Sequence, residues 1–244
     1  MKEFFRTLKE VFCVSRNEIF SYGLIPAGAG LLGIIIVLII MAVDGTGEDY
    51  GQIGAMFVLM FGAIILFFGG IFSVQSDFNL AISMGKTRKY YLPSRYLLLL
   101  AETMVILVLA YIVGKVEDAL YPTLYPGAVC DLRVSGFLNS PFLFLGIGLV
   151  VPVIILLFGV LLMRFSAKFF WFLWALWMFG CIGAPRIASA AVHKPDSIPG
   201  KLGLAFMEFS NGLSPLQISG MFAVVLLAGM VITFALFRKQ RVTA

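Results

Sequence analysis

Six stretches of almost uninterrupted apolar residues occupy close to half of this chain, and they limit its fold more than any other feature. Each is about as long as a bilayer's hydrocarbon core is thick, about 30 Å, which a helix crosses in about 20 residues. Unlike the strands of a membrane barrel, the stretches do not alternate apolar and polar residues. They predict six transmembrane helices in one domain, residues 1–244, at approximately 24–43, 53–72, 96–113, 142–163, 169–191 and 218–237.

The composition argues against a water-soluble fold. Hydrophobic residues make up 61% of the chain and charged residues 13%. Soluble domains contain about 45–50% and about 25%, respectively. A chain of 244 residues cannot bury that much apolar surface away from water. We therefore expect an all-α integral membrane protein.

Lys and Arg residues are divided unequally between the two sides of the predicted membrane. Thirteen of the 18 lie before the first span, after the sixth, or in the loops that join spans two to three and four to five. Loops rich in Lys and Arg stay in the cytoplasm. We therefore expect both termini to be cytoplasmic, and we attribute the net charge of +5 to this bias rather than to nucleic-acid binding.

The first 17 residues predict an amphipathic helix that precedes the first span. On a helical wheel its apolar side chains gather within about 120°, opposite the charged ones. A basic helix of this kind lies in the plane of the membrane interface. We expect an elbow helix that serves as a simple anchor or borders a partner's docking surface. Its apolar face consists of Phe4, Phe5, Leu8, Val11 and Phe12.

The loop before the last span also has a helical pattern. Leu202, Ala205, Phe206 and Phe209 recur at helical spacing, and Asn211-Gly212 is a typical helix stop. We expect an outer hairpin whose short amphipathic helix lies in the interface or dips part-way into the membrane. The alternative is a loop that rests on the surface.

Residues that support catalysis or metal binding are sparse. The single histidine, His193, lacks the convergent partners that a zinc site needs. Gly85-Lys86-Thr87 resembles the end of a phosphate-binding loop, but the glycine required five residues earlier is replaced by Leu80. Glu102, inside the third span, could pair with Arg95, reach the headgroups or line a vestibule. We expect no catalytic residue, no metal and no nucleotide site in this chain.

The segment between spans two and three predicts a contact with a soluble partner. Asp77 can cap a helix of about seven residues, and Gly85 can end it. The helix has apolar side chains on two opposite sides, so one side is available to a partner. The alternative is an ordinary loop at the interface. The segment comprises Asp77, Phe78, Asn79, Leu80, Ala81, Ile82, Ser83, Met84, Gly85, Lys86, Thr87, Arg88 and Lys89.

Residues 78–88 of this segment are similar to the F-N-x-A-x-S-M-G-x-T-R stretch of the permease subunits of type V ABC exporters. These are small six-span permeases of the bacterial ABC type-2 transporter superfamily. The predicted order of elbow helix, six spans, cytoplasmic coupling helix and outer hairpin also resembles them. The resemblance implies that residues 77–85 contact a separate ATPase subunit and that residues 86–89 flank the contact. It also implies two permease chains, identical or related, joined to two copies of the ATPase, which holds ATP and Mg.

From this resemblance we expect a permease subunit of the bacterial cell membrane, without enzymatic activity of its own. With its ATPase it would export an amphipathic or hydrophobic cargo such as a peptide or an antibiotic, and membrane lipid is its other partner. Two alternatives stay open. The chain could be a stand-alone secondary carrier or channel, or a scaffold or immunity protein that transports nothing.

Overall fold

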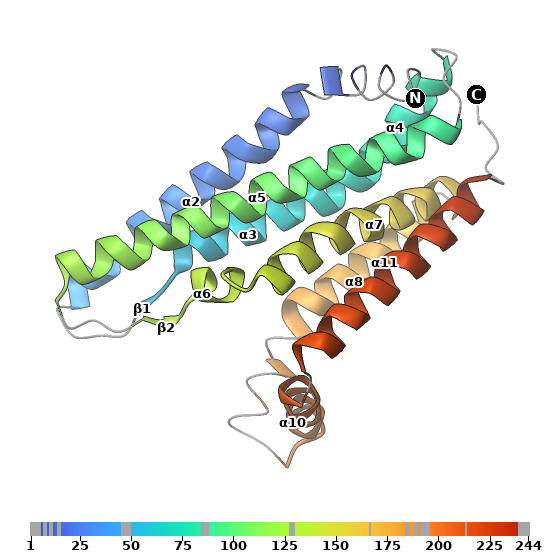
Figure 1. Cartoon of the computed structure of the whole chain (residues 1–244). Coiled ribbons are helices and arrows are strands. Elements are labelled where there is room, and N and C mark those ends of the chain that lie inside the picture. The colour runs from blue at the N-terminus through green and yellow to red at the C-terminus, as the bar shows by residue number, and fades with distance from the viewer. Residues whose placement is uncertain are drawn as a thin grey trace.

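The computed structural model describes residues 6, 9, 12–13, 16–44, 50–83, 88–126, 130–165, 167–183, 186–187, 190, 196–212 and 214–238. Long helices lie side by side, and a short parallel β-pair lies at one end (Figure 1). The helices are α2 (Arg16–Asp44), α3 (Ile53–Ile64), α4 (Gly70–Ser83), α5 (Arg88–Leu124), α6 (Val134–Leu138), α7 (Pro141–Phe165), α8 (Ala167–Met178), α10 (Ile198–Asn211) and α11 (Pro215–Arg238). Two π-helical segments, η1 (Ile65–Gly69) and η2 (Phe179–Gly183), continue α3 and α8.

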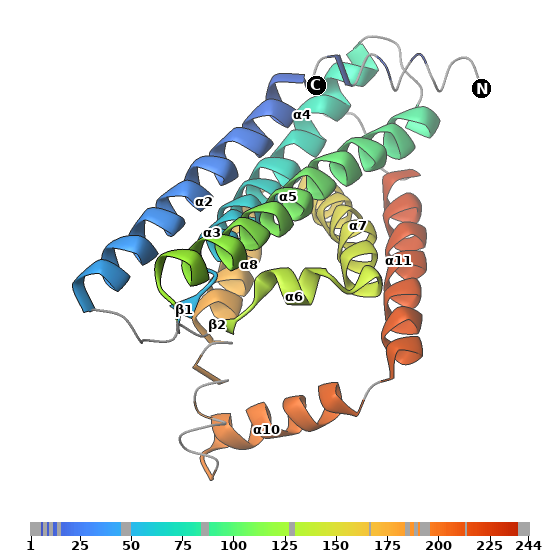
Figure 2. The ribbon, with the colours of Figure 1, turned by 60° about the vertical axis from the view of Figure 1, so that its left-hand side comes forward.

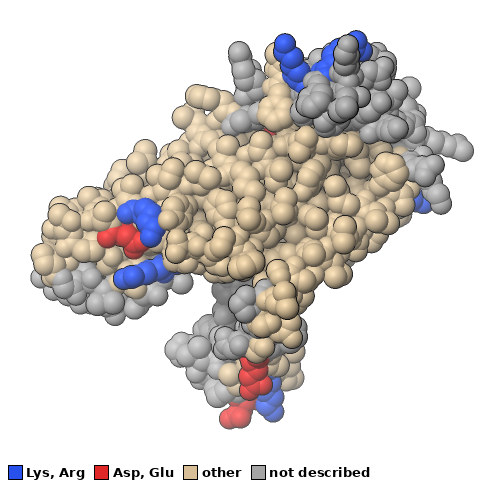
Figure 3. All heavy atoms as spheres, in the orientation of Figure 1, with Lys and Arg blue, Asp and Glu red and all other residues tan. Residues whose placement is uncertain are grey.

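Five helical segments in the described part are long and apolar enough to cross a membrane. They are Phe20–Val43, Ile53–Leu80, Tyr91–Leu124, Pro141–Phe165 and Leu216–Phe237. On the face drawn in Figure 3, the charged side chains among the described residues lie toward the ends of the molecule, and the middle shows none. The chain is therefore an all-α, multi-pass membrane protein, as predicted.

The predicted span at residues 169–191 corresponds to α8 and η2. These segments contain 12 and five residues, and at 1.5 Å per residue they form a helix of about 25 Å. That length is slightly less than the hydrocarbon thickness of about 30 Å. A crossing by this segment stays a prediction.

Helices α2 and α3 touch through glycine. A Cβ atom added at Gly33 would lie 2.6 Å from the Cα atom of Gly54, and one added at Gly30 would lie 2.7 Å from a methyl group of Val58. Small residues allow helix backbones to approach each other in lipid, where van der Waals contact drives association. At Gly33 the backbones of α2 and α3 therefore meet directly.

The helix of the third span is longer than predicted. Residues 114–140 were expected to form an outer loop, but α5 continues to Leu124 and includes Pro122. The rest of that stretch contains α6 and the strand β2 (Cys130–Leu132), which pairs in parallel with β1 (Tyr50–Gly51). The helix extends because Glu117 and Tyr121, one turn apart on α5, have hydrogen-bond partners in the bundle.

The prediction that Asp77 begins a separate short helix is wrong. Asp77 lies inside α4, which follows α3 and η1 without a break and ends at Ser83. The residues of the segment that fall within α4 are therefore the last two turns of a long helix. The chain does not break at Asp77 because α5 supplies a partner for its carboxylate. Residues 84–87 lie outside the described residues.

The two amphipathic elements differ in how much of them is described. Of the predicted elbow face only Phe12 is described, and it is helical and half-buried; Phe4, Phe5, Leu8 and Val11 lie outside the described residues. The predicted helix before the last span is present as α10, which ends at Asn211 as expected. Figure 2 shows α10 lying across the end of the bundle, between the ends of α8 and α11.

We predict that Gly33→Ala lowers the stability of the bundle by about 1–3 kcal/mol, because the new methyl group would overlap the backbone of α3. Gly28→Ala is the matched control, since a Cβ atom at Gly28 of the same helix meets nothing within 4 Å. Unfolding in mixed micelles by SDS titration, followed by circular dichroism, measures both variants. Equal stability of the two variants would contradict the close approach of α2 and α3.

Candidate functional site

The sequence placed the functional segment at the end of the second span, and there the structure has a buried ion pair. The Arg95 guanidinium of α5 lies 2.8 Å from the Asp77 carboxylate of α4 and also donates to the Ser73 hydroxyl. The Arg95 side chain is completely buried, whereas that of Asp77 is 17% exposed. We call Ser73, Asp77 and Arg95 the inner clasp. It fixes the end of α4 to the beginning of α5.

Aromatic rings surround the inner clasp and connect it to the last helix. The Tyr91 hydroxyl donates to the Val74 carbonyl oxygen at 2.8 Å. The ring of Phe78 packs edge-on against Tyr91 and Phe237, with centroids 5.6 and 5.0 Å apart. Tyr91 and Phe237 stack at 6.0 Å. All three rings are almost completely buried, so α4, α5 and α11 are packed together at this end.

The structure separates the predicted coupling residues into two groups. Phe78 is buried within the chain and is not available to a partner. Leu80, one turn from the end of α4, has 43% of its surface exposed. Arg88 and Lys89 begin α5. Asn79 is also exposed, and Asp77 belongs to the inner clasp. The side chains of residues 81–89 are not described, so the coupling role of the segment stays a prediction.

A second polar cluster lies at the opposite end of α5. The Glu117 carboxylate accepts hydrogen bonds from the backbone N–H groups of Gly54 and Ala55, at 2.8 and 3.0 Å, and from the Tyr121 hydroxyl at 2.9 Å. Gly54 and Ala55 are the second and third residues of α3, whose first N–H groups have no partner inside the helix. The negative carboxylate also suits the positive end of the helix dipole. We call these four residues the outer clasp.

A buried glutamine joins this end of α5 to α6. The Gln52 amide donates to the Gly114 carbonyl oxygen at 3.0 Å and to the Ser135 hydroxyl at 3.1 Å. It accepts from the Ser135 N–H at 2.8 Å, and the Ser135 hydroxyl donates to Asp118 at 2.6 Å. Every polar group of the Gln52 side chain is therefore used within the chain. The arrangement positions α6 against α3 and α5.

Glu102 lies on α5, between the two clasps. It is completely buried, two turns after Arg95. Arg95, one of the possible partners that the sequence offered for Glu102, forms an ion pair with Asp77 of the preceding helix. Glu102 therefore faces the inside of the bundle rather than lipid, which suits a vestibule or a structural role. A carboxylate inside a membrane protein is costly and usually marks a functional position.

Glu117 and Gln52 were not predicted to be buried, because both fall outside the predicted spans. The sequence did contain a signal for a longer helix, because Glu117 and Tyr121 are four residues apart and therefore lie on the same face of a helix. Among the residues that the structure describes, no group of three or more His, Cys, Asp or Glu side chains gathers as a metal site. The described polar groups hold the helices together at two levels, the inner clasp and the outer clasp.

We predict that Asp77→Asn or Arg95→Gln alone lowers stability by about 3–5 kcal/mol, because each leaves a charged partner in an apolar environment. The double variant Asp77→Asn/Arg95→Gln should lose less than the sum of the two. SDS-titration unfolding of the three proteins forms a double-mutant cycle. Lys115→Gln is the control, since Lys115 is half-exposed and 4.0 Å from Asp118, and it should change stability by less than about 1 kcal/mol. Strictly additive losses would rule out the inner clasp.

No protein-family model, no curated protein and no solved structure matches this chain.

Proposed function

We propose that this chain is the permease subunit of an ATP-driven exporter of the type V ABC class. Two such chains would pair in a bacterial cell membrane, with their termini in the cytoplasm, and bind two copies of a separate ATPase that holds ATP and Mg. The cargo would be amphipathic or hydrophobic, such as a peptide or an antibiotic. The proposal starts from the likeness of residues 78–88 to the coupling segment of these permeases.

The observation that carries the proposal is the inner clasp. A permease driven by a soluble ATPase needs a cytoplasmic contact from which a displacement reaches several spans. The proposed contact is the link between α4 and α5, and the helix ends on either side of it lie at the same end of the molecule as the beginning of α2 and the end of α11 (Figure 1). Directly behind this link, the Asp77–Arg95 ion pair and the rings of Phe78, Tyr91 and Phe237 join α4, α5 and α11. A partner that moves this link would therefore move three helices together.

Helix α10 supports the proposal from the other end of the molecule. Ile198, Leu202 and Ala205 share one face of α10 and are all exposed, Ile198 by 80% and Leu202 by 59%. A short helix with an exposed apolar face is suited to the membrane interface. An interfacial or re-entrant hairpin before the last span is part of the architecture that the resemblance implies.

The test is co-purification of the full-length tagged chain from its native membranes in a mild detergent, with mass spectrometry of the accompanying proteins. We expect a chain that carries a Walker A loop to co-purify. Leu80→Asp should lower its yield per permease at least about fivefold, or roughly 1 kcal/mol, because it places a charge on the exposed end of α4. Leu124→Asp is the matched control, since Leu124 is 51% exposed at the far end of α5.

Two results would contradict the proposal. The first is that no nucleotide-hydrolysing chain accompanies the protein. The second is that Leu80→Asp and Leu124→Asp have the same effect on the yield of that chain. Phe78 is not used in this test, because an aspartate there would disrupt the buried aromatic cluster and lower stability by itself.

A stand-alone carrier is the second candidate, and the burial of Glu102 in the middle of α5 favours it. A carrier driven by an ion gradient needs an ionisable group inside the membrane. Purified chain in liposomes would then acidify or alkalinise the lumen when a proton gradient is imposed, and Glu102→Gln would abolish that flux. If the export proposal holds, the purified chain carries no gradient-driven flux, and Glu102→Gln changes nothing in this assay.

A further inference from the structure

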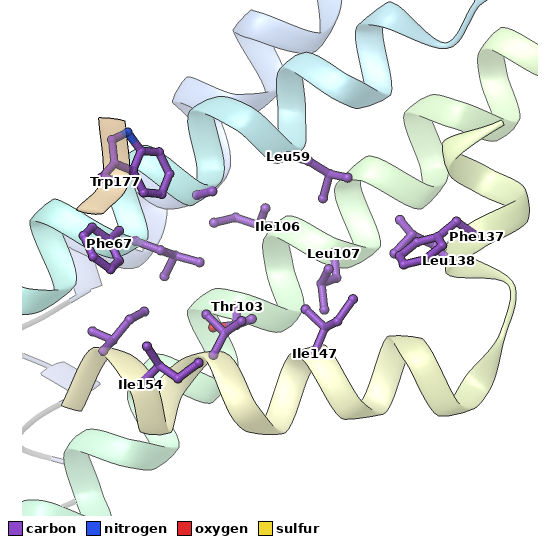
Figure 4. A pocket seen from close by; sticks show the side chains of 14 residues that line it. Leu59, Phe67, Thr103, Ile106, Leu107, Phe137, Leu138, Ile147, Ile154 and Trp177 are labelled. Atoms are coloured by element: carbon purple, nitrogen blue, oxygen red, sulfur yellow. The ribbon is translucent and has the colours of Figure 1, made fainter. Parts of the chain in front are cut away.

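A cavity of about 360 Å³ lies inside the chain, between the two clasps of α5. Its walls come from α3 and η1, from α5 and from α7, with Trp177 of α8 (Figure 4). Figure 4 shows Phe67 and Trp177 at one end of the cavity and Phe137 and Leu138 of α6 at the other. The cavity therefore runs along the helices, from the aromatic side chains of η1 and α8 to the short helix α6.

The walls of the cavity are apolar. Among the described lining residues, only Thr103 and Trp177 carry a polar side-chain atom. The Thr103 hydroxyl already donates to the Leu99 carbonyl oxygen at 2.7 Å. A buried water needs two to four polar partners, which these walls do not offer. The cavity is therefore suited to a hydrocarbon group and not to water or a polar cargo.

Its length fits one acyl chain. The lining residues extend from Leu59 to Phe67 along α3 and η1, and from Ile147 to Ile155 along α7. At 1.5 Å per residue, each wall is about 12 Å long. Half of the hydrocarbon core, the depth that a single acyl chain covers, is about 15 Å. The length of the cavity is thus close to the depth that one acyl chain covers.

One of the described π-helical segments lines the cavity, and the other begins close to it. η1 contributes Leu66 and Phe67, and η2 begins two residues after Trp177. The rings of Phe67 and Trp177 stack at 5.2 Å, and a second cavity of about 270 Å³ lies beyond them, near Gly180. π-Helical turns are rare and are frequent at functional sites. Their placement here indicates that the space is a regular feature of the fold and not a packing defect.

The end of the cavity at α6 reaches the surface. Phe137 lines it and is 52% exposed. Arg133 lies one turn earlier, is exposed, and its carbonyl oxygen accepts from the Phe137 N–H at 3.3 Å. Arg133 is the N-cap residue of α6, and its Cβ atom lies 3.4 Å from the position that a Cβ atom would take at Gly136, next to Phe137. A phospholipid whose chain passes Phe137 would therefore have its phosphate near the positive charge of Arg133.

We propose that this cavity is a binding site for one acyl chain of a membrane phospholipid, which enters past Phe137 with its terminal methyl group toward Trp177. The site holds the lipid between α3, α5 and α7, on the side of the molecule that carries α6. It does not depend on the export function, because the lipid comes from the surrounding bilayer and is not the cargo.

Fluorescence quenching by phospholipid with brominated chains tests the proposal on the full chain in detergent micelles. Bromine quenches tryptophan only on close approach, and Trp177 lines the cavity. The chain has three tryptophans, and the other two, Trp171 and Trp174, are 64% and 42% exposed, so both are replaced by phenylalanine. Ala63→Phe then fills the cavity, since Ala63 lines it and is exposed. Ala223→Phe is the matched control on α11, where Ala223 is also exposed.

We expect quenching of Trp177 that saturates at a low lipid-to-protein ratio. Ala63→Phe should weaken the apparent affinity at least about tenfold, or roughly 1.4 kcal/mol, whereas Ala223→Phe should leave it unchanged. Bromine near the end of the acyl chain should quench more than bromine near the headgroup. Quenching that rises in proportion to lipid without saturation would overturn the proposal. Equal quenching in Ala63→Phe and Ala223→Phe would also overturn it.

A second filling variant and a second probe complete the test. If Ala63→Phe does not elute as a monodisperse protein, Leu59→Phe replaces it, since Leu59 lines the same cavity from α3. Brominated free fatty acid is titrated in parallel with the phospholipid. Saturable quenching by the phospholipid supports the assignment to a bilayer lipid, and saturable quenching by the fatty acid alone overturns it.

Discussion

Polar groups inside a bilayer must find their partners within the protein, and the structure of this chain depends on how α5 meets that requirement. A buried polar group without a partner costs several kcal/mol in hydrocarbon. At one end of α5, Glu117 accepts from the first turn of α3. At the other end, Arg95 binds Asp77 and Ser73 of α4. The helix formed by α3, η1 and α4 is therefore held by α5 at two separate levels.

Between these two levels, α5 and the second span meet through apolar side chains. In one region they pack closely, and in another they leave a cavity. Glycines at positions 62 and 70 allow side chains of α5 to approach the second span closely. Near η1, by contrast, the helices leave a cavity, because a π-helical turn contains an extra residue and changes the direction of the side chains that follow it. This part of the bundle therefore has two ends that are fixed by an ion pair and by hydrogen bonds. Between these ends lies an apolar space that can accommodate a hydrocarbon chain.

This arrangement relates the proposed function to the proposed lipid site. The inner clasp adjoins the segment that would receive the ATPase, whereas the cavity lies farther along α5 and along the helix that α3, η1 and α4 form. A displacement of α4 and α5 relative to α7 would change the shape of the cavity, since all of these helices line it or continue from its walls. A lipid that binds more tightly to one arrangement of the helices than to another would stabilise the first arrangement. The stabilisation equals the difference between the two binding free energies.

Much of the fold could be predicted from local sequence, and the parts that could not share a cause. The apolar stretches predicted the spans, and Asn211-Gly212 predicted the end of α10. The continuation of α4 through Asp77, and of α5 through Glu117, was missed because a charged residue normally ends an apolar span. Each carboxylate is tolerated only because its partner comes from another helix, Arg95 for Asp77 and the N–H groups of Gly54 and Ala55 for Glu117.

The sequence by itself determined that this protein lies in a membrane as a set of helices, because hydrophobicity and helical hydrogen bonding are properties of each segment alone. Only the tertiary structure decided where those helices end, which polar side chains are buried, and where the cavity lies. These features arise from residues far apart in the sequence, such as Gln52 and Ser135, which are 83 positions apart and whose meeting depends on how the helices pack.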